Sequence, residues 1–164
     1  HRSNMTFHFE IVDETDPHIV SNTQGAWLLG YIDGVGGGRI ATEYQLDSLA
    51  GIIGAMRPEW LAVTKSEALE LARECDMEGY MVRREDGGGD TYFKLKSPHY
   101  LTKKFLMRMG RGKVEKMFAN PTDFKRSCDE EFYKIVDAIT ISFTEDQWKD
   151  MTDQERRTFI EGIV

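Results

Sequence analysis

Residues 77–97 read MEGYMVRREDGGGDTYFKLKS, two extended runs separated by three consecutive glycines. Both runs are rich in aromatic and aliphatic residues, and glycine lets the chain reverse between them. This pattern predicts an antiparallel β-hairpin. Because side chains alternate across a strand, we expect Lys94 and Lys96 on one face of it, with Phe93 and Leu95 on the other.

Two neighbouring lysines on one strand face repel each other unless an anion lies near them. At about 4 Å and an effective dielectric constant of about 20, two such charges interact with roughly 4 kcal/mol. Lys94 and Lys96 therefore indicate a phosphate site. Glu78 opens the other strand and offers a carboxylate for a divalent cation. The alternative is a solvent-facing edge strand, where lysine is common, beside an ordinary surface glutamate.

Further strands are predicted before the hairpin, and helices follow it. Residues 6–12 alternate in a way that predicts Phe7 and Phe9 facing the core, with Glu10 on the other side or simply at the surface. Residues 26–32 form a nearly continuous apolar strand, which we expect to be buried on both faces. The spacing of apolar residues predicts helices at 44–56, from 65 to about 75, and at 100–109, 113–118, 130–139 and, in pieces, 145–164.

These elements predict an α+β protein. The chain has 164 residues and is 40% hydrophobic, enough to bury one substantial core. We divide it into an antiparallel-sheet part at 6–99 and a small helical carboxyl-terminal region at 100–164. Residues 1–5 carry no pattern and are set apart as a cloning remnant.

The composition excludes several classes of protein. No apolar run approaches the roughly 20 residues that cross a bilayer, so we expect a cytoplasmic protein without a membrane partner. Cys75 and Cys128 lie far apart with no zinc-binding pattern around them. The formal net charge of -7 argues against broad, sequence-independent binding to nucleic acid.

The basic residues are nevertheless concentrated in one stretch, between Tyr92 and Lys116. We therefore consider RNA contact by Lys103, Lys104, Arg108 and Arg111, with a solvated helical face as the alternative. Trp148 is expected to pack in the core rather than stack on a base. The stretch contains Lys94, Lys96, Lys103, Lys104, Arg108, Arg111, Lys113 and Lys116.

Four short motifs occur in an order that resembles a known family. They read FEIV at 9–12, WLLG at 27–30, EGYMV at 78–82 and FKLKSPHYL at 93–101. This series is similar to the later motifs of the covalent nucleotidyltransferases. Within that superfamily it looks most like the ATP-dependent phage RNA ligases that repair broken tRNA anticodon loops. The resemblance covers about residues 6–101 and implies part of an ATP-grasp-like nucleotidyltransferase domain.

The resemblance implies an activity and roles for four residues. Such ligases use ATP and Mg²⁺ (or Mn²⁺) to seal 5′-phosphate and 3′-hydroxyl RNA ends, tRNA among them, through lysyl-AMP and RNA-adenylate intermediates. Glu10 matches the glutamate that contacts the nucleotide ribose, and Glu78 the one that organises the catalytic metal. Lys94 and Lys96 match the lysines that hold the ATP α-phosphate. The stretch around Trp27 matches the adenine-binding region.

One departure from the family bears directly on activity. The nucleophilic lysine of these ligases lies in a KxDG motif before the FE strand, and no KxDG occurs in this chain. We therefore interpret the chain as a fragment of a longer ligase whose amino-terminal segment is its missing partner, active in the cytoplasm of a phage-infected cell. Two alternatives remain: a non-catalytic RNA- or partner-binding module, and an unrelated α+β domain with coincidental motifs.

Overall fold

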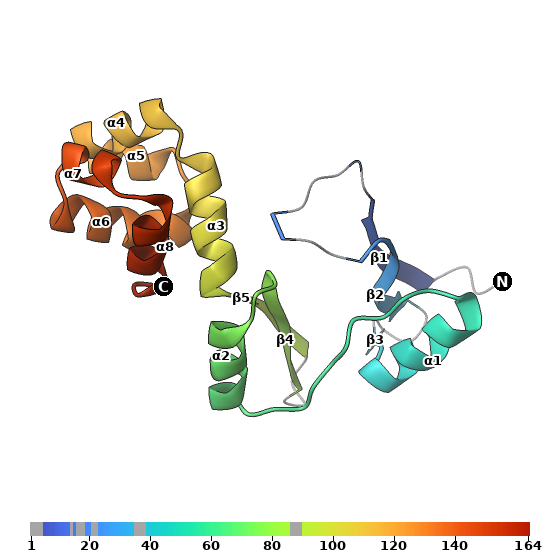
Figure 1. Cartoon of the computed structure of the whole chain (residues 1–164). Helices are drawn as coiled ribbons and strands as arrows, with labels where there is room; N and C mark the ends of the chain where they lie inside the picture. The colour runs from blue at the N-terminus through green and yellow to red at the C-terminus, as the bar shows by residue number, and fades with distance from the viewer. Residues whose placement is uncertain (1–4, 14, 16–18, 21–22, 35–38, 86–89) are drawn as a thin grey trace. The chain divides into compact units, whose positions relative to one another are not determined.

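The computed structural model describes residues 5–13, 15, 19–20, 23–34, 39–85 and 90–164. These residues form two small antiparallel sheets and a set of helices, so the predicted α+β class is confirmed at this level (Figure 1). The chain divides into two compact units. The first contains His1–Lys65 and Arg83–Tyr92, and the second contains Ser66–Val82 and Phe93–Val164.

The first unit is built on a three-stranded antiparallel sheet. Its order is β1-β2-β3, with Glu10 opposite Trp27 in the register and an irregularity between His8 and Phe9. Trp27 also forms an isolated parallel bridge with Met56, which lies beyond the helix of this unit. The strands are β1 (Met5–Val12), β2 (Gly25–Asp33) and β3 (Arg39–Ile40).

Burial in this sheet differs from the prediction. Phe7 and Phe9 are 41% and 43% exposed, and Leu29 is 44% exposed, so a core-facing β1 and a doubly buried β2 were both wrong. The reason is that β1 is an edge strand and that α1 (Glu43–Ile53) packs on β2. Leu28, which is fully buried, joins α1 in a core with Ala41, Leu46 and Ala50.

Local chemistry sets the limits of α1. Thr42 and Gln45 form a reciprocal capping box at its start, which satisfies free backbone N–H groups. Gly54 ends the helix with a φ of 72°, in the left-handed region that glycine adopts without steric cost. The predicted helix at 44–56 is therefore confirmed, although it ends at Ile53.

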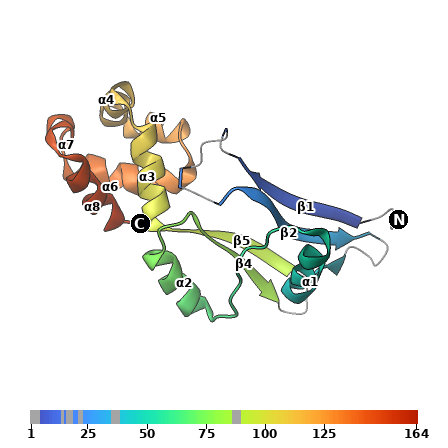
Figure 2. The ribbon, with the colours of Figure 1, turned by 45° about the vertical axis from the view of Figure 1, so that its right-hand side comes forward.

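The predicted hairpin is confirmed as a two-stranded sheet of β4 (Gly79–Glu85) and β5 (Asp90–Lys96), which run side by side in Figure 2. Its predicted glycine turn lies outside the described residues. Before it comes α2 (Lys65–Glu74). After it come α3 (Pro98–Arg108), α4 (Arg111–Ala119), α5 (Pro121–Arg126), the 3-10 turn η1 (Glu130–Phe132), α6 (Tyr133–Ser142), α7 (Glu145–Asp150) and α8 (Asp153–Glu161).

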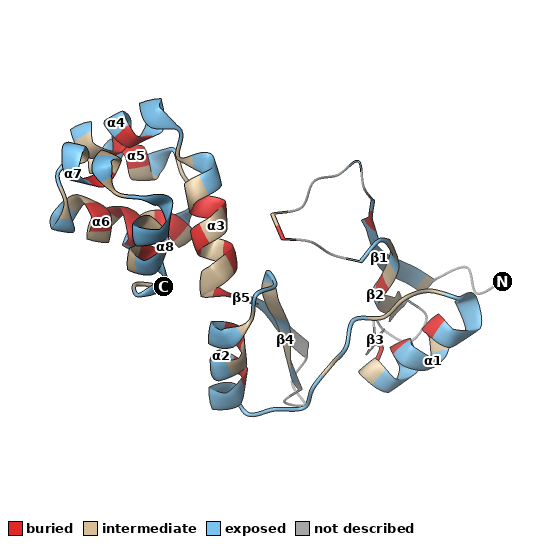
Figure 3. Cartoon of the chain, viewed as in Figure 1, coloured by how far each residue is buried: buried red, intermediate tan, exposed pale blue. Residues whose placement is uncertain are grey.

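These carboxyl-terminal helices enclose the larger core of the molecule. Its centre is α6, where Ile135, Val136 and Ile139 are fully buried. Figure 3 shows the buried stretches of α6 in red. Trp148 is 2% exposed and packs against the rings of Phe143 and Phe159, which confirms that it is a core residue. The other buried members are Phe105, Val114, Met117, Phe124, Phe132 and Ile160.

One helix in this region was not predicted. Asn120 caps the start of α5 by accepting a hydrogen bond from the N–H of Asp123, and Pro121 occupies the first helical position. The Asn-Pro pair thus starts a helix between the two that were predicted at 113–118 and 130–139. Among the described residues, no helix combines the length and the apolar character that crossing a bilayer requires.

Candidate phosphate-binding hairpin

Gly79 ties the Glu-Gly pair of the first strand to the lysine strand. Its φ is +131°, a backbone conformation that L side chains rarely adopt. A Cβ at this position would lie 2.1 Å from the carbonyl oxygen of Leu95 and 2.8 Å from the Cα of Lys96. The absence of a side chain therefore lets the backbone after Glu78 lie directly against the backbone between the two lysines.

Ser97 fixes the same end of the hairpin. Its backbone N–H donates to the carbonyl of Glu78 at 2.9 Å, and its Oγ donates to the carbonyl of Met77 at 2.5 Å. The same Oγ accepts the N–H of Tyr100 at 3.1 Å and so caps α3. Ser97 is completely buried. The serine after the two lysines thus joins both strands to the first turn of the following helix.

The two predicted phosphate-binding lysines differ in their surroundings. Lys94 is exposed, as is Glu78, and among the described residues neither has an ion-pair partner. The side chain of Lys96 is 24% exposed. Its Nζ donates to Oε2 of Glu131 at 2.6 Å and lies 5.4 Å from the ring centre of Tyr100. The anion that lies beside Lys96 in the structure is therefore a carboxylate of the helical region.

Glu131 belongs to a series of alternating charges. Its other oxygen, Oε1, accepts a hydrogen bond from Lys104 of α3. Lys104 is buried and also pairs with Asp129 at 3.1 Å, and Asp129 pairs with Arg108 at 2.6 Å. The acid-rich run at 128–131 is visible in the sequence, but periodicity gives no indication of its partners, so these two acids were missed.

The pKa values in this series reflect competing effects. Burial by itself would raise the pKa of Glu131, but hydrogen bonds from Lys104 and Lys96 outweigh burial and lower it. Burial would likewise lower the pKa of Lys104, and its hydrogen bonds with Glu131 and Asp129 raise it instead. The carboxylate and the ammonium groups therefore hold one another in their charged forms.

Glu10, predicted to contact the ribose, lies in the first unit. It is exposed on β1, opposite Trp27 in the register. Trp27 is half-buried, and its indole N–H donates to the carbonyl of Thr23 at 3.0 Å. The prediction that Glu10 shares a site with Glu78, Lys94 and Lys96 stays a prediction.

Sequence reasoning also missed an arginine clamp in the first unit. Arg57 donates to the carbonyl of Leu28 and pairs with Glu43 and with Asp47, the latter at 3.1 Å. Glu43 also lies 3.5 Å from Arg83 of β4. The guanidinium groups bind α1 to its neighbours, which is a structural role, and the lone arginine before Pro58 gave no sign of it.

The donors for a metal are few. Within the described parts of the chain, no three His, Cys, Asp or Glu residues gather as a metal-binding group. Mg²⁺ is commonly held by one or two carboxylates together with substrate phosphates and water, so the single exposed carboxylate of Glu78 fits a cation that arrives with a nucleotide. The ammonium groups of Lys94 and Lys96 have the charge that a phosphate requires.

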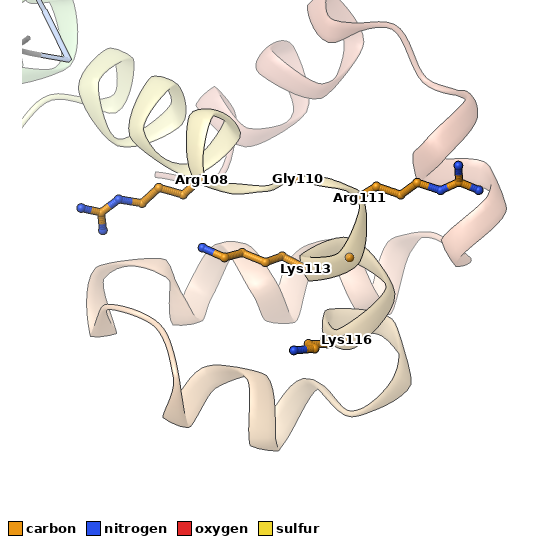
Figure 4. Close-up of a pocket in the computed structure, with 6 residues that line it drawn as sticks. Arg108, Gly110, Arg111, Lys113 and Lys116 are labelled. Carbon is orange, nitrogen blue, oxygen red and sulfur yellow. The ribbon is translucent and has the colours of Figure 1, made fainter.

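A second basic feature surrounds the start of α4. Arg108, Lys113 and Lys116 extend to the same side of the turn at Gly110, whereas Arg111 extends away (Figure 4). With Gly112 these residues line a shallow concavity of about 460 Å³. Lys104, which we considered as an RNA contact, is buried in its ion pairs and does not belong to this surface.

Comparison with protein-family models, curated proteins and solved structures gives no match for this chain.

Proposed function

We propose that this chain is part of an ATP-dependent RNA ligase and that its β4–β5 hairpin supplies the phosphate and metal contacts of the nucleotide site. The ligase would join 5′-phosphate and 3′-hydroxyl RNA ends, those of tRNA among them, through lysyl-AMP and RNA-adenylate intermediates. The proposal rests on the ordered motifs and on the chemistry of the residues that those motifs bring together.

The observation that carries this proposal is the junction of the two hairpin strands. Gly79 and Ser97 hold the start of β4 against the end of β5, so Glu78 adjoins the strand that carries Lys94 and Lys96. Lysines at fixed positions stabilise the charge that develops on a transferring phosphoryl group. In this proposal they hold the ATP α-phosphate, Glu78 holds the cation that accompanies ATP, and Glu10 binds the ribose.

The proposal requires a further segment that carries the KxDG lysine. Exposed apolar side chains on the first sheet are compatible with such a segment packing there, because large apolar groups at a surface commonly mark contact sites. Phe7, Phe9 and Leu29 are each more than 40% exposed, and Ile11 is 63% exposed. Without that segment, the chain should not become adenylylated.

ATP binding and adenylylation test the proposal. We expect the chain to bind ATP in an NMR titration and Lys94→Ala or Lys96→Ala to weaken binding about tenfold, the usual loss for a charge-assisted hydrogen bond. Lys65→Ala is the matched control, because it removes an exposed lysine outside both the hairpin and the basic concavity. In a longer gene product with a KxDG motif, the same hairpin variants should lose covalent labelling by ATP. Normal labelling of both would end the proposal.

A second candidate, a non-catalytic RNA-binding module, is favoured by the concavity at Gly110. Its lining contains four basic residues and two glycines but no acid. We expect Lys113→Ala with Lys116→Ala to weaken oligouridine binding and to lower its salt dependence, because fewer lysine–phosphate contacts release fewer counterions on binding. Unchanged oligouridine binding by this double variant across a salt series would reject the RNA-binding module. Lys94→Ala, which changes the hairpin and not the concavity, should leave oligouridine binding unchanged.

A further inference from the structure

We propose that Glu131 is a positioning residue that holds the ammonium group of Lys96 ready for a nucleotide phosphate. The inference rests on the function proposed above and adds the helical region to its site. Lys96 ends β5 and Glu131 lies in η1, so a contact between them links the hairpin to the helical region. The 2.6 Å hydrogen bond is that link.

Glu131 is itself held in place by neighbouring side chains. Its side chain is 22% exposed, and one of its oxygens is bound by the buried ammonium group of Lys104. Lys104 is in turn held by Asp129 and lies 5.5 Å from the ring of Phe132. Glu131 is therefore a carboxylate whose orientation is held by its partners in the helical region, which is what a positioning group requires.

Lys96 keeps hydrogen-bond donors available for a ligand. An ammonium group has three N–H donors, and Glu131 accepts from one of them, so the others remain for an incoming anion. The flexible lysine stem usually loses rotamer freedom when it binds a phosphate, and the contacts with Glu131 and Tyr100 restrict that freedom beforehand. Binding then carries a smaller entropic penalty.

The sign of the local charge is also compatible with a bound phosphate. The series contains three cations, Lys96, Lys104 and Arg108, and two carboxylates, Glu131 and Asp129. The cluster is thus cationic as a whole, and a phosphate is still attracted to it. Positioning is therefore compatible with a negative side chain beside the lysine.

The test measures ATP binding to the complete 164-residue chain together with the ammonium signals of ¹⁵N-labelled lysine. Glu131→Gln keeps the shape of the side chain and removes its charge. We expect the ammonium signal of Lys96 to be protected from exchange in the unaltered chain and to lose that protection in this variant. ATP should bind to the variant about fivefold more weakly, because Lys96 keeps its charge but loses the group that positions it. Glu131→Asp, which keeps the charge on a shorter side chain, should lie between the variant and the unaltered chain.

Asp137→Asn is the matched control, because Asp137 holds Lys125 at 2.7 Å beside the ring of Tyr133, a similar arrangement elsewhere in the helical region. It should leave ATP affinity unchanged. Tighter ATP binding by Glu131→Gln would overturn the inference, since it would make Glu131 a competitor of the phosphate. Unchanged binding would also overturn it.

Lys94→Ala and Lys96→Ala distinguish failure of the positioning role from failure of the proposed function. If both weaken ATP binding while Glu131→Gln does not, the positioning role fails and the proposed function stands. If neither lysine variant affects ATP binding, the hairpin is not the phosphate site, and the proposed function and the inference fail together. Circular dichroism of each variant shows whether it is folded. If Glu131→Gln does not fold, ATP binding by Glu131→Asp tests the positioning role instead.

Discussion

The helical region and the first sheet differ in how completely they bury their apolar side chains. In the helical region, α6 lies at the centre and its inward side chains are completely enclosed. In the first unit, α1 and β2 enclose a small core around Leu28, while β1 exposes Phe7, Phe9 and Ile11. Buried apolar area is the main stabilising contribution to a fold, so the helical region should be the more stable of the two.

The largest expected effect comes from opening the helical core. Ile139→Ala should lower the free energy of unfolding of the second unit by about 2–5 kcal/mol, because it leaves a cavity in a site that is fully enclosed. Chemical denaturation followed by fluorescence can assign this loss, since Trp148 reports on the second unit and Trp27 and Trp60 on the first.

Leu28→Ala is the matched change in the first unit, because Leu28 is also fully buried. We expect it to lower the denaturation midpoint reported by Trp27 and to leave the midpoint reported by Trp148 unchanged. If either variant shifts both transitions equally, the two units unfold as one cooperative system and the contrast between them does not describe stability.

The elements of the fold were largely predictable because their signals are local. The triple glycine indicated the hairpin, and residues such as Thr42 and Thr144 carry their capping chemistry in the adjacent sequence. Burial was less predictable. Whether Phe9 is covered depends on which element packs on β1, and alternation along one strand does not contain that information.

The residues of the candidate site likewise include some that the sequence predicted and one that it did not. Lys94, Lys96 and Glu78 were recognisable as charged residues in an apolar hairpin. Glu131 was not, because its distance from Lys96 is set by the folding of three intervening helices rather than by any spacing of the sequence. Tertiary partners of this kind require coordinates.

A smaller effect is expected at the hairpin, where the second unit depends on close backbone packing rather than on a core. Gly79→Ala should destabilise this unit by about 2 kcal/mol, because a Cβ would collide with the backbone of Leu95 and the φ of +131° is unfavourable for alanine. Thermal denaturation measures the loss.

Gly112→Ala provides the control for this change. Gly112 lies in α4, where a Cβ would meet nothing within 4 Å, so alanine should stabilise the helix by up to about 1 kcal/mol. Equal effects of the two substitutions would show that the hairpin junction tolerates a side chain, and the close approach would then not explain the glycine.

The smallest effect is the contribution of Glu131 to the response of the second unit to acid. The lowered pKa of Glu131 means that its ion pairs stabilise the folded state above the pKa of a glutamate in the unfolded chain, 4.5. This stabilisation is lost as the pH falls through the lower folded pKa. We expect a loss of about 1 kcal/mol between pH 5 and the acid limit, a typical size for a partly exposed pair.

Denaturation of the unaltered chain and of Glu131→Gln at several pH values measures this contribution as the difference between their slopes. Glutamine does not titrate, so the variant should lose less stability in acid than the unaltered chain. High salt should reduce the difference, because the side chain of Glu131 is partly exposed and its ion pairs are screened. If the slopes agree, the contact of Lys96 with Glu131 adds nothing to folding. A role for Glu131 in nucleotide binding would then rest on its effect on ATP affinity, because a group can orient a neighbour without stabilising the fold that carries it.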